Sequence, residues 1–191
     1  LLGLVLLSPW LVLRAWRTGR YRQNLRAKLF GSEIPKKVAR TRLRIWLHGV
    51  SVGEIHLLKI LVAALRKELP NVELLISSTT DTGLAEARKN FPDLTVFPFP
   101  FDFSWSVHKT MTSAEPDLIL LAESELWPNF LQIASQKKIP VLVINGRMSP
   151  RSAKRYQKIA RLARPCLFDH VTLFAMQSTT YARGLLSLRI P

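Results

Sequence analysis

The sequence predicts an α/β domain in which a parallel β-sheet is covered by helices on both faces. Short apolar runs recur along the chain from residue 45 onward, and stretches with helical patterns separate them. Strands that are buried on both faces have continuous apolar sequences, and their alternation with helices is typical of a Rossmann-like domain. The apolar content of 48% is that of a folded globular chain.

The first strand and the first helix of this domain flank a turn of small residues. The apolar run at 45–47 predicts a buried strand, and an apolar-rich stretch at 55–69 predicts the helix that follows the turn. Ser51-x-x-Glu54 matches a capping box, in which the serine caps the helix and the glutamate returns the hydrogen bond. Taken alone, the motif favours this structural role for Glu54 over a catalytic one.

The remaining elements repeat this alternation of strand and helix. Short apolar runs predict strands at 72–77, 94–98, 117–122, 141–144 and 172–176. The stretches between them predict helices at 84–90, 105–112, 128–137 and 150–163. Pro98 and Pro100 mark a loop, and Pro128 suits the first turn of a helix. The last of these helices is long and basic.

The amino-terminal residues differ in character from this domain. Residues 1–13 are an apolar run broken by Ser8 and Pro9, and a basic, aromatic stretch follows at 14–22. Thirteen helical residues span about 20 Å, which is short of the roughly 30 Å hydrocarbon core of a bilayer. The run fits a truncated transmembrane anchor or an interfacial helix better than a signal peptide, because no small-x-small cleavage site follows. The alternative is a basic arm that binds nucleic acid.

We therefore expect a membrane-anchor remnant and a basic juxtamembrane segment at 1–40, and the Rossmann-like domain at 41–191. The positive-inside rule would place the domain on the cytoplasmic face of the membrane. The chain does not begin with methionine and stops without an evident finishing element, so we expect a fragment of a longer protein.

The charge of the chain points to an anionic partner. The formal net charge is +15, and residues 126–168 contain nine basic residues and no acid. Nucleic acid, a phosphorylated substrate or an anionic membrane would each suit such a surface. The single cysteine, Cys166, excludes an internal disulfide, and we expect it to be a buried small hydrophobic residue.

Polar residues follow several of the predicted strands, where each strand ends. In chain order they are His48, Ser51, Gly53, Glu54, Thr79, Thr80, Glu123, Glu125, Asn145, Arg147, Ser149, Arg151 and Ser152. Right-handed crossovers bring these strand ends to one edge of the sheet, and ligands of open α/β sheets bind at that edge. We therefore predict one functional site that is shared by these loops.

Cofactor and metal motifs are missing from the sequence. It has no Gly-x-Gly-x-x-Gly fingerprint and no Gly-Lys-Ser/Thr phosphate loop. Glu123-x-Glu125 resembles a metal pair, but alternate residues of an extended segment share a face without any ion. The four histidines have no ligand spacing. We expect neither a metal nor a cofactor.

Four motifs together resemble one enzyme family. They are His48-x-x-Ser51-Val52-Gly53-Glu54, Thr79-x-x-x-Gly83, Glu123-Ser124-Glu125-Leu126-Trp127-Pro128-Asn129 and Asn145-Gly146-Arg147-Met148-Ser149-x-Arg151-Ser152. Their order and intervals resemble those of the 3-deoxy-D-manno-octulosonic acid (Kdo) transferases of lipopolysaccharide biosynthesis. The resemblance implies a GT-B glycosyltransferase, of which this chain is the amino-terminal, acceptor-binding half. The carboxyl-terminal half, which holds most of the CMP-Kdo donor site, is then missing, and we expect the chain alone to be inactive.

The resemblance also implies roles for the site residues. The reaction is transfer of Kdo from CMP-Kdo to a hydroxyl of a lipid A precursor at the cytoplasmic face of the inner membrane. By resemblance and by position Glu54 is the general base, and Glu123 and Glu125 orient the acceptor or support Glu54. The helix dipole would lower the basicity of Glu54 and desolvation would oppose that effect, so the sequence leaves the balance open.

The basic helix is the second informative feature. Arg151, Lys154, Arg155, Lys158 and Arg161 recur at three- and four-residue steps, so we expect one stripe that binds acceptor phosphates or the anionic bilayer. Arg147 joins this surface, and Ser149 and Ser152 cap the helix or bind phosphate. The alternatives are a GT-B transferase with another anionic acceptor, a degenerate non-catalytic domain, and a basic nucleic-acid-binding α/β module. An aromatic-basic strand motif is missing, so we expect no nucleic-acid partner.

Overall fold

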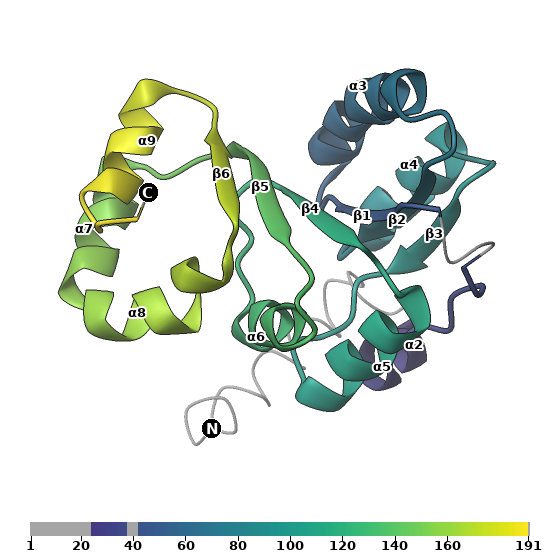
Figure 1. The fold of residues 1–191 in the computed structure, drawn as a ribbon, viewed down its shortest axis with the longest axis horizontal. Coiled ribbons are helices and arrows are strands. Elements are labelled where there is room, and N and C mark those ends of the chain that lie inside the picture. The colour runs from purple at the N-terminus through teal and green to yellow at the C-terminus, as the bar shows by residue number, and fades with distance from the viewer. Residues whose placement is uncertain (1–23, 38–41, 191) are drawn as a thin grey trace.

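The computed structural model describes residues 24–37 and 42–190. Its centre is a six-stranded sheet whose order is β3-β2-β1-β4-β5-β6, and every neighbouring pair is parallel (Figure 1). The strands are β1 (Arg44–His48), β2 (Glu73–Ser78), β3 (Thr95–Pro98), β4 (Leu118–Ala122), β5 (Val141–Gly146) and β6 (Leu173–Met176). The predicted α/β class and the Rossmann-like sheet are confirmed.

The helices alternate with these strands as the sequence predicts. They are α2 (Leu25–Phe30), α3 (Val52–Glu68), α4 (Asp81–Asn90), α5 (Ser104–Ala114), α6 (Pro128–Gln136), α7 (Pro150–Lys158), α8 (Ala160–Cys166) and α9 (Thr179–Leu186), with a 3₁₀ turn η1 at Phe168–His170. Each helix from α3 to α6 belongs to a crossover connection, which leads from the end of one strand back to the start of the next, as parallel strands require.

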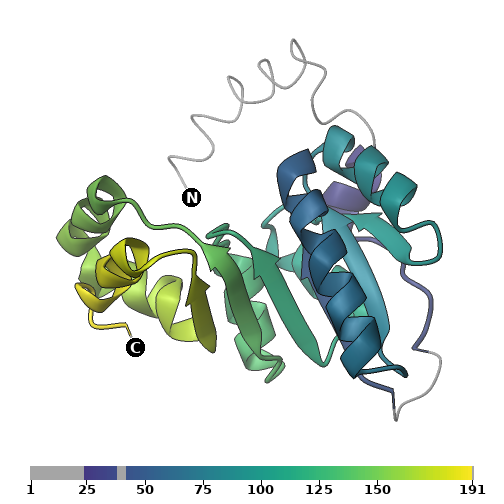
Figure 2. The ribbon, with the colours of Figure 1, turned by 90° about the horizontal axis from the view of Figure 1, so that it is seen from above.

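Two apolar layers hold the sheet between helices. On one face Trp46 packs with Phe97 and with Phe130 of α6, and α5 completes the layer. On the other face Ile55 and Leu58 of α3 pack with strand residues, and α4 adds Ala87. Figures 1 and 2 show α3 and α4 on one side of the sheet and α5, α6 and α2 on the other. Both faces of the central strands are buried, which explains their continuous apolar sequences.

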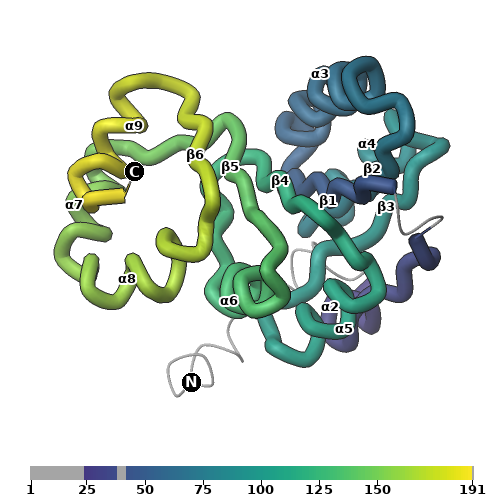
Figure 3. The backbone as a smooth tube through the Cα atoms, in the orientation of Figure 1, coloured from purple at the N-terminus to yellow at the C-terminus, as the bar shows by residue number. Residues whose placement is uncertain are grey.

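A third apolar cluster lies beyond β5 and β6, where α7, α8, η1 and α9 gather (Figure 3). The single long helix predicted at 150–163 is wrong, because the chain leaves helical geometry at Ile159, with φ −118° and ψ 22°. The break folds α8 back, so that Ala163 joins Ala153 and Leu185 in this cluster. Arg161 consequently lies on a different helix from the rest of the predicted stripe.

The expectation of a buried Cys166 is also wrong. Cys166 is the last residue of α8 and is exposed. The apolar contacts of this turn come instead from Ala163 and Phe168, which the cluster buries. A lone cysteine on a broken, basic helix had no neighbouring pattern from which its exposure could be predicted.

Part of the segment expected to lie beside the membrane packs on the domain. Two donors, the Phe101 N–H at 2.8 Å and the Ser106 hydroxyl at 2.7 Å, hold the carbonyl of Lys28 in α2. The Ile34 N–H donates to Ser113 Oγ at 2.7 Å. Lys28 is fully buried, and its Nζ lies 3.0 Å from Asp81 Oδ1 at the head of α4. The end of this segment is thus part of the folded body.

The apolar run at 1–13 and the basic stretch at 14–22 lie outside the described residues. No helix in the parts of the chain that the structure describes has the length and apolar character needed to cross a bilayer. The division of the chain at residue 40 and the membrane-anchor assignment stay predictions.

Candidate functional site

The predicted site lies at the point where the strand order reverses. From β1 the chain passes to β2 and β3 on one side, whereas β4, the other neighbour of β1, leads to β5 and β6 on the opposite side. Glu54 follows β1, and Glu123 and Glu125 follow β4. Ligands of open α/β sheets bind at the carboxyl ends of strands at such a switch point.

Glu54 is held by two hydrogen bonds at the head of α3. Its Oε2 accepts the Val50 N–H at 2.6 Å, and its Oε1 accepts the Ser51 hydroxyl at 2.9 Å. The capping box is therefore only partly formed. Glu54 does return to the backbone, but it accepts the N–H of Val50, one residue before the cap residue Ser51, and the Ser51 side chain makes no cap hydrogen bond to the helix. Ser51 instead orients the carboxylate.

The electrostatic environment of Glu54 raises its pKa. Burial raises the pKa of Glu54 most, the hydrogen bonds from Val50 and Ser51 lower it, and the charge of Glu123 raises it, with a raised pKa as the result. Desolvation therefore outweighs the hydrogen bonds from Val50 and Ser51 that stabilise the charged form. A carboxylate with a raised pKa is a stronger base than an ordinary exposed one.

Glu125 shares this environment. Burial raises the pKa of Glu125, and the nearby charges of Glu54 and Glu123 raise it further, whereas a hydrogen bond from the Trp127 side chain lowers it. Glu123 differs because its Oε1 lies 3.5 Å from Nη1 of Arg147. Its backbone has φ 65°, a left-handed conformation that costs energy for a residue other than glycine. The three predicted carboxylates therefore lie close enough for the charge of one to change the pKa of another.

The loop after β2 supports the Glu54 loop from beside it. Ser78 Oγ and Thr80 Oγ1 both donate to the Val50 carbonyl, at 3.0 Å and 2.6 Å. Thr80 Oγ1 also accepts the Gly83 N–H at 3.1 Å and so caps α4. A Cβ atom on Gly83 would lie 2.9 Å from the Val50 carbonyl oxygen, so only glycine allows this approach. Thr80 therefore acts on the site through the backbone that carries Glu54.

His48 lies beneath the site and is fully buried. Its ring stacks on Phe99, with centroids 4.0 Å apart, and its Nδ1 lies 2.9 Å from Ser77 Oγ. Burial lowers the pKa of His48 to about 3, although a contact with the Ser77 backbone acts in the opposite direction. The imidazole is neutral at physiological pH. Its Nε2 lies 3.4 Å from Oγ1 of Thr79, the first residue after β2.

The loop after β5 lies one strand further from the switch point. Asn145 lies inside β5, near its end, and adopts a left-handed conformation with φ 54°. In the loop itself, the Arg147 N–H donates to Ser124 Oγ at 3.0 Å, which joins this loop to the loop after β4. Ser149 accepts the Ser152 N–H at 3.1 Å and caps α7. Among the described residues, no hydrogen bond or ion pair joins Ser149, Arg151 or Ser152 to the carboxylates.

The basic surface is formed mainly by α7. Arg151, Lys154, Arg155 and Lys158 are exposed on this helix, and the Arg147 side chain is half exposed. Gly53, another predicted site residue, is exposed at the start of α3, and an added Cβ there would have the Ser51 Oγ as its nearest neighbour, at an ordinary van der Waals distance of 3.9 Å.

Asp102 lies in the loop after β3, which Pro98 and Pro100 mark in the sequence, and it was not predicted to have a structural role. Trp127 precedes α6 and makes no side-chain cap, so Asp102 supplies one from the loop after β3. Its carboxylate accepts the N–H groups of Asn129 at 3.1 Å and Phe130 at 2.8 Å. Asn129 Nδ2 in turn donates to the Asp102 carbonyl at 2.6 Å. The sequence did hold one indication of this contact: α6 begins after Trp127, whose side chain cannot cap a helix, so a capping group had to come from elsewhere in the chain.

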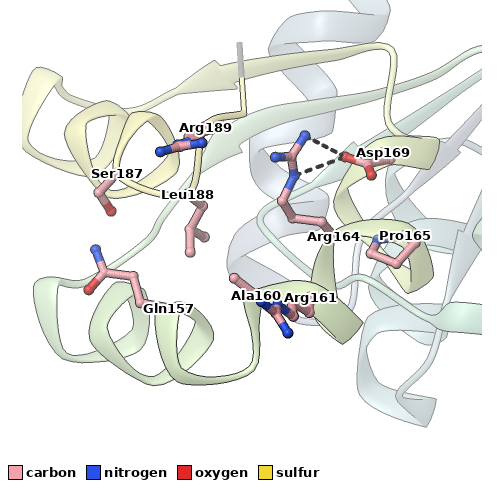
Figure 4. A pocket seen from close by; sticks show the side chains of 9 residues that line it. All are labelled: Gln157, Ala160, Arg161, Arg164, Pro165, Asp169, Ser187, Leu188 and Arg189. Atoms are coloured by element: carbon pink, nitrogen blue, oxygen red, sulfur yellow. Dashed lines mark hydrogen bonds and ion pairs between the residues drawn. The ribbon is translucent and has the colours of Figure 1, made fainter.

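A separate pocket of about 500 Å³ lies between α8 and the segment after α9 (Figure 4). Arg161, Arg164 and Arg189 line it, and Arg164 points toward Asp169 at 3.4 Å. Arg161 of the predicted basic stripe lines this pocket, but none of the site residues predicted at the strand ends does. In the part of the chain that the structure describes, no group of three histidine, cysteine or acidic side chains is arranged to hold a metal ion.

Comparison with known proteins adds a family assignment to this geometry. The sequence model of the family described as 3-deoxy-D-manno-octulosonic-acid transferase (kdotransferase) matches residues 16–191. A transferase of that name from Chlamydia pneumoniae is 32% identical over 189 residues, which are 98% of this chain and 43% of the relative. Another, from Haemophilus influenzae, is 31% identical over 149 residues, which are 77% of this chain and 34% of the relative.

Two further matches extend the comparison. A bifunctional glycosyltransferase/methyltransferase from Fusobacterium nucleatum is 35% identical over 147 residues, 75% of this chain and 23% of that protein. A crystal structure from Listeria monocytogenes, of a protein assigned as a UDP-N-acetylglucosamine 2-epimerase, superposes with a TM-score of 0.55 at 11% identity. That superposition covers 77% of this chain and 42% of the other, and it shows a shared fold alone. The chain spans less than half the length of these relatives.

Proposed function

This chain belongs to the 3-deoxy-D-manno-octulosonic acid transferase family, and from that premise we propose that it is the acceptor-binding half of a GT-B glycosyltransferase. The complete protein transfers Kdo from CMP-Kdo to a hydroxyl of a lipid A precursor in lipopolysaccharide biosynthesis. The observation that carries the proposal is the group of carboxylates at the switch point, in which Glu54 and Glu125 both have raised pKa values.

In this proposal Glu54 is the general base. A sugar hydroxyl is a weak nucleophile, so a positioned carboxylate must take its proton as the oxygen attacks the anomeric carbon of Kdo. The new bond joins that oxygen to the anomeric carbon, the bond from this carbon to the phosphate oxygen of CMP breaks, and CMP leaves. The hydrogen bonds from Val50 and Ser51 hold the carboxylate in one orientation, and its raised pKa strengthens it as a base.

The neighbouring acids have supporting roles in the proposed reaction. Glu125 is partly buried and hydrogen-bonded by Trp127, so it is suited to orient a hydroxyl of the acceptor. Glu123 is paired with Arg147, and this pair links the loops after β4 and β5 across the mouth of the site. Ser51 acts by orienting Glu54, Thr80 acts through the Val50 carbonyl, and Gly53 leaves the head of α3 open.

The basic residues suit an anionic acceptor at a membrane. Arg147 and the exposed cations of α7 would bind acceptor phosphates or anionic headgroups, and arginine is favoured at such sites because it binds phosphate in a bidentate manner. The apolar run at 1–13 and the basic stretch after it support attachment to the cytoplasmic face of the inner membrane. The donor CMP-Kdo would bind mostly to the other half of the complete protein.

The proposal is tested by transfer of Kdo from CMP-Kdo to a lipid A precursor with the complete protein that contains this chain. Glu54→Gln removes the base and keeps the shape, and we expect transfer to fall about 100-fold or more while acceptor binding persists. Glu68→Gln is the matched control, because Glu68 is exposed at the other end of the same helix.

Two outcomes would contradict this account in different ways. Full transfer by Glu54→Gln would show that Glu54 has only a structural role at the head of α3. Glu123 and Glu125 would then be the candidates for the base. No transfer by the unmodified complete protein, with its fold verified, would overturn the assignment of Kdo as the transferred group.

A further inference from the structure

Four side chains form a hydrogen-bonded series that runs from the core to the edge of the site. Trp46 Nε1 lies 2.7 Å from Ser77 Oγ, which lies 2.9 Å from Nδ1 of His48. On the other side of the imidazole, Nε2 lies 3.4 Å from Thr79 Oγ1. The register of the sheet sets this order, because His48 of β1 is directly opposite Ser77 of β2.

The first member of the series fixes the direction of the hydrogen bonds. An indole N–H is only a donor, so Ser77 Oγ must accept from Trp46. Among the described residues, the one other partner of Ser77 Oγ is Nδ1 of His48. A buried hydroxyl hydrogen without an acceptor is costly, so the Ser77 hydroxyl donates to Nδ1.

The tautomer of His48 follows from this direction. A neutral imidazole that accepts at Nδ1 carries its hydrogen on Nε2. That hydrogen points to Thr79 Oγ1, which therefore accepts. The hydroxyl hydrogen of Thr79 is then free for a ligand.

Packing holds the side chains of this hydrogen-bonded series in place. Trp46, His48 and Ser77 are all fully buried, and aromatic contacts of Trp46 with Phe97 and of His48 with Phe99 hold both rings. The low pKa of His48, about 3 as a result of burial, keeps the imidazole neutral. The imidazole therefore carries a single hydrogen across the physiological pH range, and the hydrogen-bond partners of its two nitrogens decide which one carries it.

We propose that Ser77 and His48 are positioning residues that make the Thr79 hydroxyl a hydrogen-bond donor to the bound acceptor substrate. The ligand group that it recognises is an oxygen with a free lone pair, such as a sugar hydroxyl or a phosphate oxygen. Glu54, at the neighbouring strand end, offers the opposite role when ionised because a carboxylate only accepts. The direction of the series stands without the proposed function, which supplies only the identity of the ligand.

The tautomer is tested directly by ¹⁵N NMR of the complete protein labelled on histidine. We expect the ¹⁵N chemical shifts of His48 to show an unprotonated Nδ1 and a protonated Nε2. Ser77→Ala should change the chemical shift of Nδ1. A protonated Nδ1 in the unmodified protein would overturn the proposal, because Thr79 would then donate to His48. This measurement needs no enzymatic activity, so it decides the direction even if Kdo transfer is never detected.

Kinetics with a double-mutant cycle test the positioning role. Thr79→Val removes the hydroxyl and should lower kcat/KM about 3- to 10-fold, the effect expected for one neutral hydrogen bond, whereas Thr79→Ser should retain activity. Ser77→Ala should lower kcat/KM in the unmodified background and add little to Thr79→Val, because both changes remove the same interaction.

Controls separate this role from loss of the fold. Thr112→Val replaces an exposed threonine on α5 and should leave kcat/KM unchanged. Ser77→Ala could instead act only by weakening the core. In that case the double variant should lose kcat/KM by the product of the two single fold-losses, and Ser77→Ala should lower the temperature of thermal unfolding equally with and without Thr79→Val. That result, or full activity of Thr79→Val in a protein that transfers Kdo, would contradict the proposal.

Discussion

Glu54 and Glu125 lie at the ends of the adjacent strands β1 and β4, and the negative charge of Glu54 contributes to raising the pKa of Glu125. Burial is the larger cause for each residue. Partly desolvated carboxylates whose pKa values are raised by the charge of a neighbouring acid, Glu54 by Glu123 and Glu125 by Glu54, are typical of catalytic sites rather than of structural ion pairs. The relationship leads to measurable effects on both activity and stability.

The first prediction concerns the pH dependence of transfer. Glu54 must be ionised to act as a base, and its pKa lies above the ordinary value because of burial. The acidic limb of kcat/KM should therefore report a pKa above the usual 4.5 of a glutamate. Glu123→Gln should move that limb toward lower pH, because the charge of Glu123 raises the pKa of Glu54. An acidic limb at or below the ordinary value would contradict the raised pKa of Glu54.

The second prediction concerns stability. A carboxyl whose pKa is higher in the folded than in the unfolded state stabilises the fold at low pH, and this stabilisation is lost as the pH rises through the folded value. At neutral pH, Glu125→Gln should therefore raise the free energy of unfolding by less than about 1 kcal/mol, a value discounted for partial exposure to solvent.

Denaturant unfolding at pH 7 and at pH 4 tests this prediction, because the difference between Glu125→Gln and the unmodified protein should shrink at the lower pH. Glu115→Gln, at the exposed residue that follows α5, is the matched control because it also replaces one carboxylate by an amide. A variant that is less stable at neutral pH would show that the hydrogen bond from Trp127 outweighs desolvation.

The third prediction concerns the cap that Asp102 provides to α6. Asp102→Ala leaves the Asn129 and Phe130 N–H groups without their acceptor and should cost about 1–2 kcal/mol of stability. It should also lower transfer, because α6 follows the loop that carries Glu123 and Glu125. Asp93→Ala breaks an exposed ion pair with Arg66 and should cost less than about 1 kcal/mol. Equal effects of the two changes would contradict the capping role.

The fourth prediction compares two glycines near the site. An added Cβ at Gly83 meets Thr80 Oγ1 and the Val50 carbonyl oxygen, both at 2.9 Å, so Gly83→Ala should destabilise the protein by about 1–3 kcal/mol. At Gly53 the nearest atom is 3.9 Å from the added Cβ, so Gly53→Ala should be neutral or stabilise α3 by up to about 1 kcal/mol. Thermal unfolding measures both. Transfer by Gly53→Ala also tests whether the acceptor needs the open space there.

The sequence by itself determined the fold class and the approximate place of the site. Strands buried on both faces must be apolar throughout, so the runs that became β1, β4 and β5 were evident without coordinates. Parallel connections bring strand ends to one edge, and that rule was sufficient to group Glu54 with Glu123 and Glu125. Local spacing also identified the cap of α7 at Ser149.

Tertiary packing decided the properties that depend on residues far apart in the chain. The break at Ile159, the exposure of Cys166 and the capping of α6 by Asp102 follow from contacts that no local pattern encodes. Burial of His48 has the same origin, because Phe99 and Ser77 enclose it from other strands and loops. The raised pKa of Glu54 is decided in the same way: desolvation depends on the whole surroundings of a carboxylate, whereas the helix dipole and the capping motif can be seen in the sequence.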